Sequence, residues 1–169
     1  FKKFKSFFKN KIKTLDCTFE INLSLKERIE TIKEEAVIAV REGITNLILS
    51  DKKISSSHAS IPSILAVGAV HSHLVKLGLR GHCSINVESS DVLDTHSFMV
   101  LIGVGATTIN PYLAIDSIYQ RFEKKLFSNS DFESCVAKFK KSIDDGLLKI
   151  MSKMGISVIS SYRGGCNFE

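Results

Sequence analysis

The chain has 169 residues, of which 44% are hydrophobic, and a mean hydropathy of +0.10, so it can bury the core of one ordinary domain. No apolar run approaches the ~20 residues of a membrane-spanning helix. The N-terminus, FKKFKSFFKNKIK, lacks the apolar centre and the cleavage site of a secretory signal. We therefore expect a protein that is neither secreted nor embedded in a membrane.

The net charge of +5 comes from one end of the chain. The first 13 residues contain six lysines and no acidic residue, whereas the rest contains 17 basic and 18 acidic residues. We interpret residues 1–13 as a basic linker, either solvated or packed on another part of a longer protein. A basic, Phe-containing arm also suits nucleic acid or an anionic membrane, but no binding motif supports either partner, and we expect neither.

The four cysteines, at positions 17, 83, 135 and 166, are too widely spaced for a CxxC metal motif or a disulfide framework. We therefore expect reduced thiols in an intracellular compartment.

Hydrophobic periodicity predicts the first elements in chain order. Residues 14–19 are expected to be extended, and a helix follows from Ser24, which forms a capping box with Glu27, to Gly43. NLILS (46–50) is an apolar strand and 52–60 a polar loop. A second helix begins near Pro62 and ends at Gly78.

The second half of the chain continues this alternation. We predict a strand within 82–89, a short helix from 95 to 105, a strand at 106–110 and a helix from Pro111 to about 127. SNSD then caps a helix that starts near Phe132 and is weakened at Gly146, and ISVISS (156–161) is the last predicted strand. The expected fold is therefore α/β, with alternating strand–helix units, a parallel sheet, and a place in a multi-domain chain.

Polar residues follow the predicted strands. These are Asp51, Glu88, Asn110 and the segment from Ser160 to Arg163. Because the carboxyl ends of parallel strands meet at one edge of a sheet, we expect them to gather on one rim, where α/β proteins bind ligands. Asp51 and Glu88 are a weak candidate for a carboxylate pair, and the simpler interpretation is that all of these residues serve turns and caps.

Three motifs have structural interpretations that we favour. His71 and His73 are two apart, which places them on different sides of a helix, so we expect packing rather than metal binding. GVGATT (103–108) follows a helix instead of a strand and is interpreted as a helix end rather than a dinucleotide site. MSKMGIS, which includes Ser152 and Lys153, is either core packing at a turn or a wall against a flat cofactor.

Several stretches resemble the large chain of glutamate synthase, in its bacterial and its ferredoxin-dependent forms. They are LDCTF, NLILSDKKI, IPSILAVGAVHSHLVKLGLR, VESSDVLDTHSFMVLIGVGATTINPYLAIDSI, and GLLKIMSKMGIS with SYRG. The resemblance covers almost all of residues 14–169. It departs from the family at His71-Ser72-His73, where three histidines are usual, and at Ser97, where a second histidine follows His96, so we expect structural roles for these residues.

The resemblance implies a fragment of an enzyme that makes two L-glutamate from L-glutamine and 2-oxoglutarate. Electrons pass through FMN and a 3Fe-4S cluster, and ammonia passes through an internal channel from a glutaminase site to a synthase site. It places the linker at 1–13, part of the central domain at 14–127, and a connecting helix with the start of the FMN-binding synthase domain at 128–169.

The same resemblance assigns no catalytic, FMN-binding or cluster-binding residue to this chain, because those motifs lie elsewhere in the family; Cys17, in particular, is not the glutaminase nucleophile. Domain-interface or channel candidates are Asp51, Glu88, Asn110, Ser152, Lys153 and Arg163. The partners implied are the other domains of the same chain and either ferredoxin or a small NADPH-oxidising flavoprotein subunit. Abundant Lys, Ile, Ser and Asn are typical of an AT-rich genome, so we favour ferredoxin, and a plastid stroma or a bacterial cytoplasm.

Two other functions are compatible with the residues alone. One is a free-standing α/β interaction or scaffold module without catalysis. The other is a small flavin-binding protein, for which Gly164-Gly165 is the only candidate phosphate loop. By itself the 169-residue chain is expected to be inactive and poorly soluble, because its last predicted strand would lack a partner.

Overall fold

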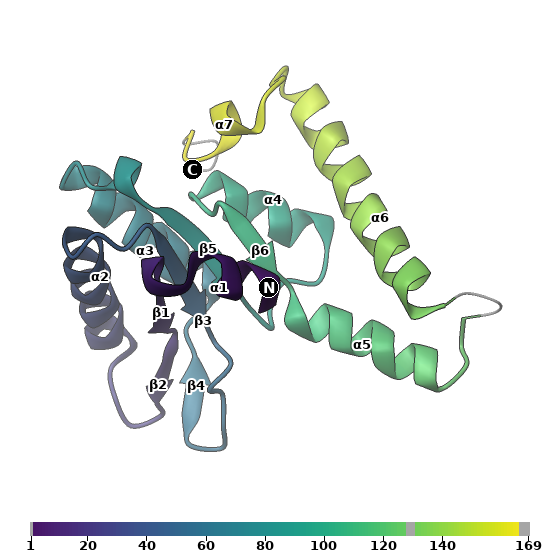
Figure 1. The fold of residues 1–169 in the computed structure, drawn as a ribbon, viewed down its shortest axis with the longest axis horizontal. Coiled ribbons are helices and arrows are strands. Elements are labelled where there is room, and N and C mark those ends of the chain that lie inside the picture. The colour runs from purple at the N-terminus through teal and green to yellow at the C-terminus, as the bar shows by residue number, and fades with distance from the viewer. Residues whose placement is uncertain (1, 128–130, 166–169) are drawn as a thin grey trace.

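The structure is a computed structural model that describes residues 2–127 and 131–165. Apart from one short additional strand at 58–60, strands and helices alternate as predicted from β3 to α5 (Figure 1). In chain order the elements are α1 (Lys2–Phe8), the 3-10 turn η1 (Lys9–Lys11), β1 (Ile12–Asp16), β2 (Thr18–Glu20), α2 (Leu25–Arg41), β3 (Asn46–Ser50), β4 (His58–Ser60), α3 (Ser63–Lys76), the 3-10 turn η2 (Arg80–His82), β5 (Ser84–Glu88), α4 (Thr95–Gly103), β6 (Thr108–Asn110), α5 (Tyr112–Glu123), α6 (Phe132–Lys153) and α7 (Ile159–Tyr162).

The central feature is a four-stranded parallel sheet in the order β1-β3-β5-β6. The strands are in register, so that Ser50 pairs with Asp16 on one side and Glu88 on the other, and Glu88 pairs with Asn110. Each crossover between neighbouring strands contains one helix. This arrangement confirms the predicted α/β class and the parallel sheet.

The two faces of the sheet have different chemistry because side chains alternate along a strand. Leu47 and Leu49 of β3 and Ile85 and Val87 of β5 belong to the main core, which α2 and α3 close on one face. The residues between them point to the other face, and include the buried polar side chains of Asn46, Ser50, Asn86 and Glu88. Helix α1 crosses this polar face (Figure 1), within the range that the sequence predicted to be a linker.

A second, two-stranded antiparallel sheet was not predicted. β2 pairs with β4, with Thr18 opposite Ser60, inside the segment predicted to be a loop. Alternation over three residues is too short for a sequence pattern to show. The small sheet fixes the segments that follow β1 and β3 next to the carboxyl ends of the main strands.

Helix ends follow the predictions in part. Gly43 and Gly78 follow α2 and α3 with positive φ of 84° and 69°, as expected of helix-ending glycines. The predicted capping box is wrong in one respect, because Ser24 is the N-cap of α2 but its side chain accepts no capping hydrogen bond. Asp131 caps α6 as expected, by accepting a hydrogen bond from the Ser134 N–H; positions 128–130 of the predicted cap lie outside the described residues.

Helix α6 continues through Gly146 without interruption, although this glycine was expected to weaken it. A Cβ atom at position 146 would lie 2.6 Å from the Thr95 side chain at the start of α4. The glycine therefore permits close approach of the two helices.

The strand predicted at 156–161 is wrong. The segment turns at Gly155, with a φ of 69°, and contains only the short helix α7. Ile156 and Ile159 pack against Tyr162 in a small cluster with Met99 and Met151. Ile159 and Tyr162 lie three residues apart within α7, so one helical turn directs both toward that cluster.

Candidate functional site

Three of the six candidate residues meet at the carboxyl ends of β3, β5 and β6. Asp51 directly follows β3, Glu88 ends β5 and Asn110 ends β6. The Asn110 Nδ2 group donates to Glu88 Oε1 at 3.2 Å, and the Asp51 backbone N–H donates to the Glu88 carbonyl at 3.2 Å. The order of the strands alone predicts this proximity.

Glu88 is the centre of this cluster, and its side chain is only 3% exposed. Ser50 Oγ donates to Oε2 at 3.0 Å, Lys52 Nζ lies 3.0 Å from Oε1, and Lys5 Nζ of α1 lies 3.5 Å from Oε2. Burial alone would raise the pKa of Glu88, but the hydrogen bonds and positive charges of these neighbours hold it below its usual value. Glu88 is therefore ionised at neutral pH, and its charge is compensated by these neighbours.

Asp51 is also buried, at 4% exposure, but its contacts are uneven. Its Oδ2 atom accepts hydrogen bonds from Ser89 Oγ at 3.2 Å, from Ser90 Oγ at 2.7 Å and from the Ser90 backbone N–H at 2.8 Å. Its Oδ1 atom is buried and has no hydrogen-bond partner. An unpaired buried carboxylate oxygen is costly in free energy, which marks this position as unusual.

The loop after β5 connects this cluster to α3. Asp91 accepts from the backbone N–H and the hydroxyl of Ser63, at 2.9 and 2.7 Å, and from Ser89 Oγ at 2.6 Å. Sequence reasoning did not select Asp91 or Ser63. The available signal was weak: the SSD run after β5, and a serine beside Pro62 at the start of the next helix.

Tyr112, the first residue of α5, borders the cluster from the β6 side. Lys52 Nζ lies 5.1 Å from the centre of its ring. Burial first, and then the neighbouring Asp51 carboxylate, raise the pKa of Tyr112 to about 12. The phenol therefore stays protonated at physiological pH.

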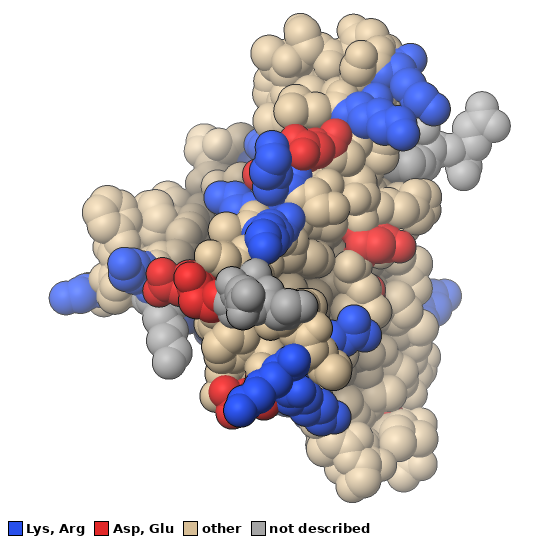
Figure 2. Space-filling view, turned by 90° about the vertical axis from the view of Figure 1, so that its right-hand side faces the viewer, with Lys and Arg blue, Asp and Glu red and all other residues tan. Residues whose placement is uncertain are grey.

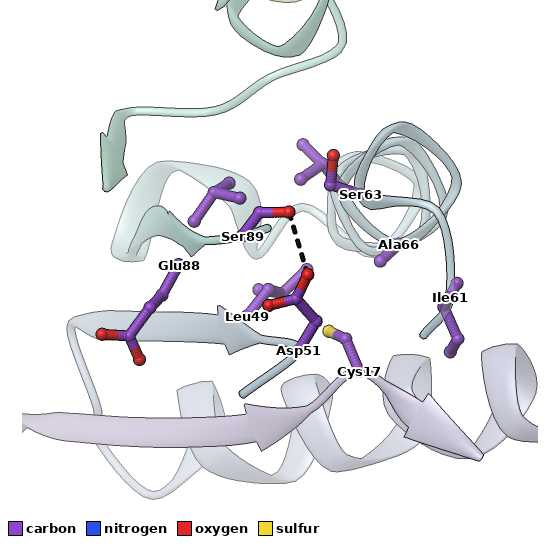
Figure 3. Close-up of a pocket in the computed structure, with 10 residues that line it drawn as sticks. Cys17, Leu49, Asp51, Ile61, Ser63, Ala66, Glu88 and Ser89 are labelled. Carbon is purple, nitrogen blue, oxygen red and sulfur yellow. Dashed lines mark hydrogen bonds between the residues drawn. The ribbon is translucent and has the colours of Figure 1, made fainter. Parts of the chain in front are cut away.

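A small cavity lies beside Asp51 (Figure 3). Its volume is about 10 Å³. Cys17, Ser63 and Ser89 line it together with Asp51, Glu88 and the apolar side chains of Leu49, Ile61, Ala66, Val67 and Val87. Burial, followed by the charge of Asp16, raises the pKa of Cys17 to about 12. The thiol therefore stays protonated at neutral pH.

The other three candidates do not join this cluster. Ser152 and Lys153 are exposed at the end of α6, and Arg163 follows α7. The backbone N–H of the adjacent Gly164 donates to the Gly103 carbonyl at 2.9 Å, at the end of α4 that precedes β6. Arg163 therefore lies toward the amino ends of the strands. The predicted gathering of all four segments on one rim is wrong for 160–163, because no strand forms there.

His71 has a structural role of the kind expected. Arg80 Nε donates to its Nδ1 atom at 3.0 Å, and burial and then the Arg80 charge lower its pKa. The imidazole ring packs against Gly105 and Gly164, where any Cβ atom would clash with it. Gly105 has a φ of 118°, which agrees with the interpretation of GVGATT as a helix end.

The described residues do not fit a metal ion or an iron–sulfur cluster. Within 2–127 and 131–165 no three His, Cys, Asp or Glu side chains are placed to hold a metal. Cys17, Cys83 and Cys135 are each buried in different parts of the fold, and Cys166 lies outside the described residues. Gly164 follows a helix and not a strand, so it does not form a flavin phosphate loop of the strand–loop–helix type.

Two surface properties complete the description. Among the residues that the structure describes, no helix has the length and apolar character needed to cross a membrane. The face formed by α5 and α6 carries side chains of both charges, interspersed (Figure 2), so this face presents no extended field of one sign.

A search of solved structures finds a similar fold. Dihydroorotate dehydrogenase (DHODH) from Eimeria tenella, solved with ferulenol, superposes with a TM-score of 0.60 at 15% sequence identity. The match covers 94% of this chain and 38% of that chain. At this identity the similarity concerns the fold alone.

Sequence comparisons are more specific. The family profile of the glutamate synthase central domain matches residues 1–169. The NADPH-type glutamate synthase large chain of Azospirillum brasilense is 52% identical over 158 residues, which are 92% of this chain and 10% of that protein. Ferredoxin-dependent glutamate synthases of Pyropia yezoensis and, in its chloroplastic form, Spinacia oleracea are 43% and 41% identical, each over 86% of this chain and 10% of the relative.

The chain therefore spans about one tenth of the length of these relatives. The chain belongs to the glutamate synthase family and corresponds to that family's central domain.

Proposed function

We propose that the polypeptide containing this chain is a glutamate synthase, which converts L-glutamine and 2-oxoglutarate into two L-glutamate with electrons that pass through FMN and a 3Fe-4S cluster. The observation that carries this proposal is the family match over residues 1–169, together with 52% identity to a relative of that name. The FMN and the cluster would be bound by other parts of the protein; among the described residues, no group of His, Cys, Asp and Glu is placed to hold a metal.

The role proposed for this segment is to connect the glutaminase and synthase sites and to form part of the wall of the ammonia channel. Support comes from the largely buried polar cluster of Asp51, Glu88 and Asn110, which lies at the edge where parallel α/β sheets present ligand-binding residues. Ser152, Lys153 and Arg163 lie elsewhere and are proposed as contacts to neighbouring domains.

For the electron donor we propose ferredoxin, and for the location a plastid stroma or a bacterial cytoplasm. The composition of the chain favours this choice, while the relatives include both ferredoxin-dependent and NADPH-dependent enzymes, of bacteria and of chloroplasts. A small NADPH-oxidising flavoprotein subunit is the partner that the other donor would require.

The first experiment is to measure the mass of the native polypeptide by immunoblot with an antibody raised against residues 24–43, and then to assay the purified protein. We expect a band far larger than the 18.7 kDa of this chain, and glutamate formation from glutamine and 2-oxoglutarate with reduced ferredoxin. A band near 18.7 kDa without activity would instead indicate a free-standing interaction module. Activity with NADPH alone would contradict the proposed donor but not the reaction.

The channel role has its own test. In Glu88→Ala, loss of the central carboxylate should disorganise the strand-end cluster, so that glutamine is hydrolysed faster than glutamate is formed and ammonia appears in solution. Lys33→Ala on α2 is a suitable control, because Lys33 pairs with the neighbouring Glu30 away from this cluster. Unchanged coupling between the two reactions in Glu88→Ala would argue against the channel role.

A further inference from the structure

Another cavity lies at the amino ends of the strands, away from the cluster around Glu88. It has a volume of about 400 Å³, which is in the range of sites for small molecules, and it lies between the last turns of α3, the end of α4 and Gly164. His71, Ser72 and Lys76 of α3 form its polar wall. Among the described residues that line it, none is acidic.

His71 presents a hydrogen-bond donor at this cavity. Its Nδ1 atom accepts from Arg80 Nε at 3.0 Å, so the proton of the neutral ring is on Nε2. Nε2 lies on the side of Gly164, which is another wall of the cavity, since a Cβ atom at position 164 would be 2.8 Å from it. The buried side-chain atoms without a partner in the described part of the chain are Asp51 Oδ1 and Arg163 Nε, and Nε2 of His71 is not one of them. The ring therefore offers an accessible N–H group.

The positive charges around the cavity lack counter-ions. Lys76 is exposed, and Arg163 directly precedes Gly164. Arg80 is close to Arg163, because burial lowers the pKa of Arg80 and the charge of Arg163 lowers it further. The ion pairs of residues 2–127 and 131–165 include none of these three cations. Arg80 donates instead to two backbone carbonyls, at 2.6 and 2.8 Å, which do not neutralise its charge.

Negative contributions near the cavity offset only part of this charge. The carboxyl ends of α3 and α4 lie at the cavity, and each helix end contributes about half a negative charge. Glu30 of α2 borders an adjoining groove together with Ser72 and Lys76, but its carboxylate pairs with Lys33 at 2.5 Å. An excess of roughly two positive charges remains, which favours the binding of an anion.

We propose that this cavity binds one small oxyanion, a phosphate or a carboxylate, through His71 Nε2, Ser72 Oγ and Lys76 Nζ. Ser72 and Lys76 are four residues apart on α3, so their side chains lie on the same face of the helix. An oxyanion offers several acceptor oxygens to these donors, and hydrogen bonds that involve a charged group are the stronger ones. This inference goes beyond the proposed function and does not rest on it.

The test is amide hydrogen exchange of the full-length protein, followed in the peptide that covers residues 156–165. α7 brings this segment back to the end of α4 (Figure 1), and the site is complete only while Gly164 is docked there. Exchange is compared in sodium chloride, sodium phosphate and sodium succinate at the same pH and ionic strength. At about ten times Kd of the anion, we expect exchange to slow about tenfold, because binding stabilises the docked state by the factor 1 + [L]/Kd. A peptide that covers residues 46–53 of the main sheet is the internal reference and should not respond.

Two variants with the same change in charge make the test specific. Lys76→Gln removes one cation from the cavity wall and should raise Kd of the anion about tenfold, which corresponds to the loss of one charge-assisted hydrogen bond. Lys141→Gln on α6 is the control, because Lys141 pairs with Asp145 at 3.4 Å and does not line the cavity, so Kd should stay the same. The difference between the variants also separates this cavity from any other site for the same anion.

The outcomes decide both the site and the kind of oxyanion. Slower exchange in phosphate, in succinate or in both supports the site and identifies which anion it accepts. No response to either anion, or an unchanged response in Lys76→Gln, would overturn the site, because its positive charge would then be compensated by another part of the protein or by solvent. None of these results affects the assignment as glutamate synthase, which is tested by product formation.

Discussion

The two apolar clusters of this molecule differ in size and in their surroundings. The main core contains buried side chains from three parallel strands and from α2 and α3, several of them with no exposed surface. The second contains three buried residues, Met99, Met151 and Tyr162, with partly buried neighbours on α4, α6 and α7. Burial of apolar area dominates folding free energy, so the sheet with α2 and α3 should unfold as one unit, while α6 and α7 should open locally at a lower cost.

The position of α6 supports this distinction. In Figure 1 the helix stands apart from the main sheet, and it packs on α4 and α5. Apolar side chains remain outside the small cluster, as Leu148 is 63% exposed and Met154 is 43% exposed. The comparison of α6 with α2 and α3 shows that an apolar helix face stabilises the fold only where another element covers it.

The largest expected effect is in the main core. Leu47→Ala removes a side chain with no exposed surface from the centre of β3, and should lower the free energy of unfolding by about 4 kcal/mol. Chemical denaturation of the chain, monitored by circular dichroism, measures this change. A loss below about 1 kcal/mol would show that the sheet core is less tightly packed than its burial indicates.

The matching change in the second cluster is Tyr162→Ala. Tyr162 is 1% exposed, so its removal should lower the free energy of opening of α6 and α7 by about 3 kcal/mol. Hydrogen exchange should become faster in residues 147–165 and stay unchanged in β3 and β5. Equal acceleration in the sheet would contradict the independence of the two clusters.

His71 connects the main core with the region of α6 and α7. Its ring can pack there because residue 105 is a glycine, Gly105. Gly105→Ala combines an unfavourable φ of 118° with a clash against the imidazole ring, so we expect a loss of about 2 kcal/mol in unfolding free energy. Gly155→Ala is the matched control, because φ is 69° and no atom lies within 4 Å of the added Cβ. Its loss should be about 1 kcal/mol, from backbone strain alone. Equal losses in thermal melts of the two variants would exclude a contribution from the His71 contact.

The same contrast explains which predictions from sequence succeeded. Strong, regular patterns predicted the elements of the main core: the apolar run of β3, the helical spacing in α2 and α3, and the glycines that end them. Strand order then predicted that Asp51, Glu88 and Asn110 meet. Patterns of only a few residues did not predict the structure, as in the three-residue strands of the small sheet.

The segment at 156–161 shows the physical reason for the main error. Its β-branched residues favour a strand, but the partner available to them is the small cluster of α4 and α6 and not the edge of a sheet. The unpaired Oδ1 of Asp51 was likewise beyond prediction, because it depends on which oxygen the serines of the next loop contact. Tertiary packing determined both features.

The smallest expected effect concerns pH and the contact between the two regions. Burial, and then the Arg80 charge, lower the pKa of His71 below the value of 6.5 that it would have when unfolded. Between these two pKa values the unfolded chain binds more protons than the folded chain, so stability is complete above pH 6.5 and falls as the pH decreases below it. The loss should stay below about 1 kcal/mol, because the ring is only half-buried and solvent screens the charge of Arg80.

The variant His71→Gln isolates this contribution. The Gln side chain keeps an oxygen acceptor for Arg80 Nε but does not titrate, so the difference between the stabilities at pH 7.5 and pH 5.5 should become smaller than in the unmodified chain. Thermal melts at the two pH values measure it, and the remaining histidines contribute equally to both proteins. If the pH dependence of the two proteins is the same, His71 binds protons equally well in the folded and unfolded states, and the contact with Arg80 does not depend on its neutral form.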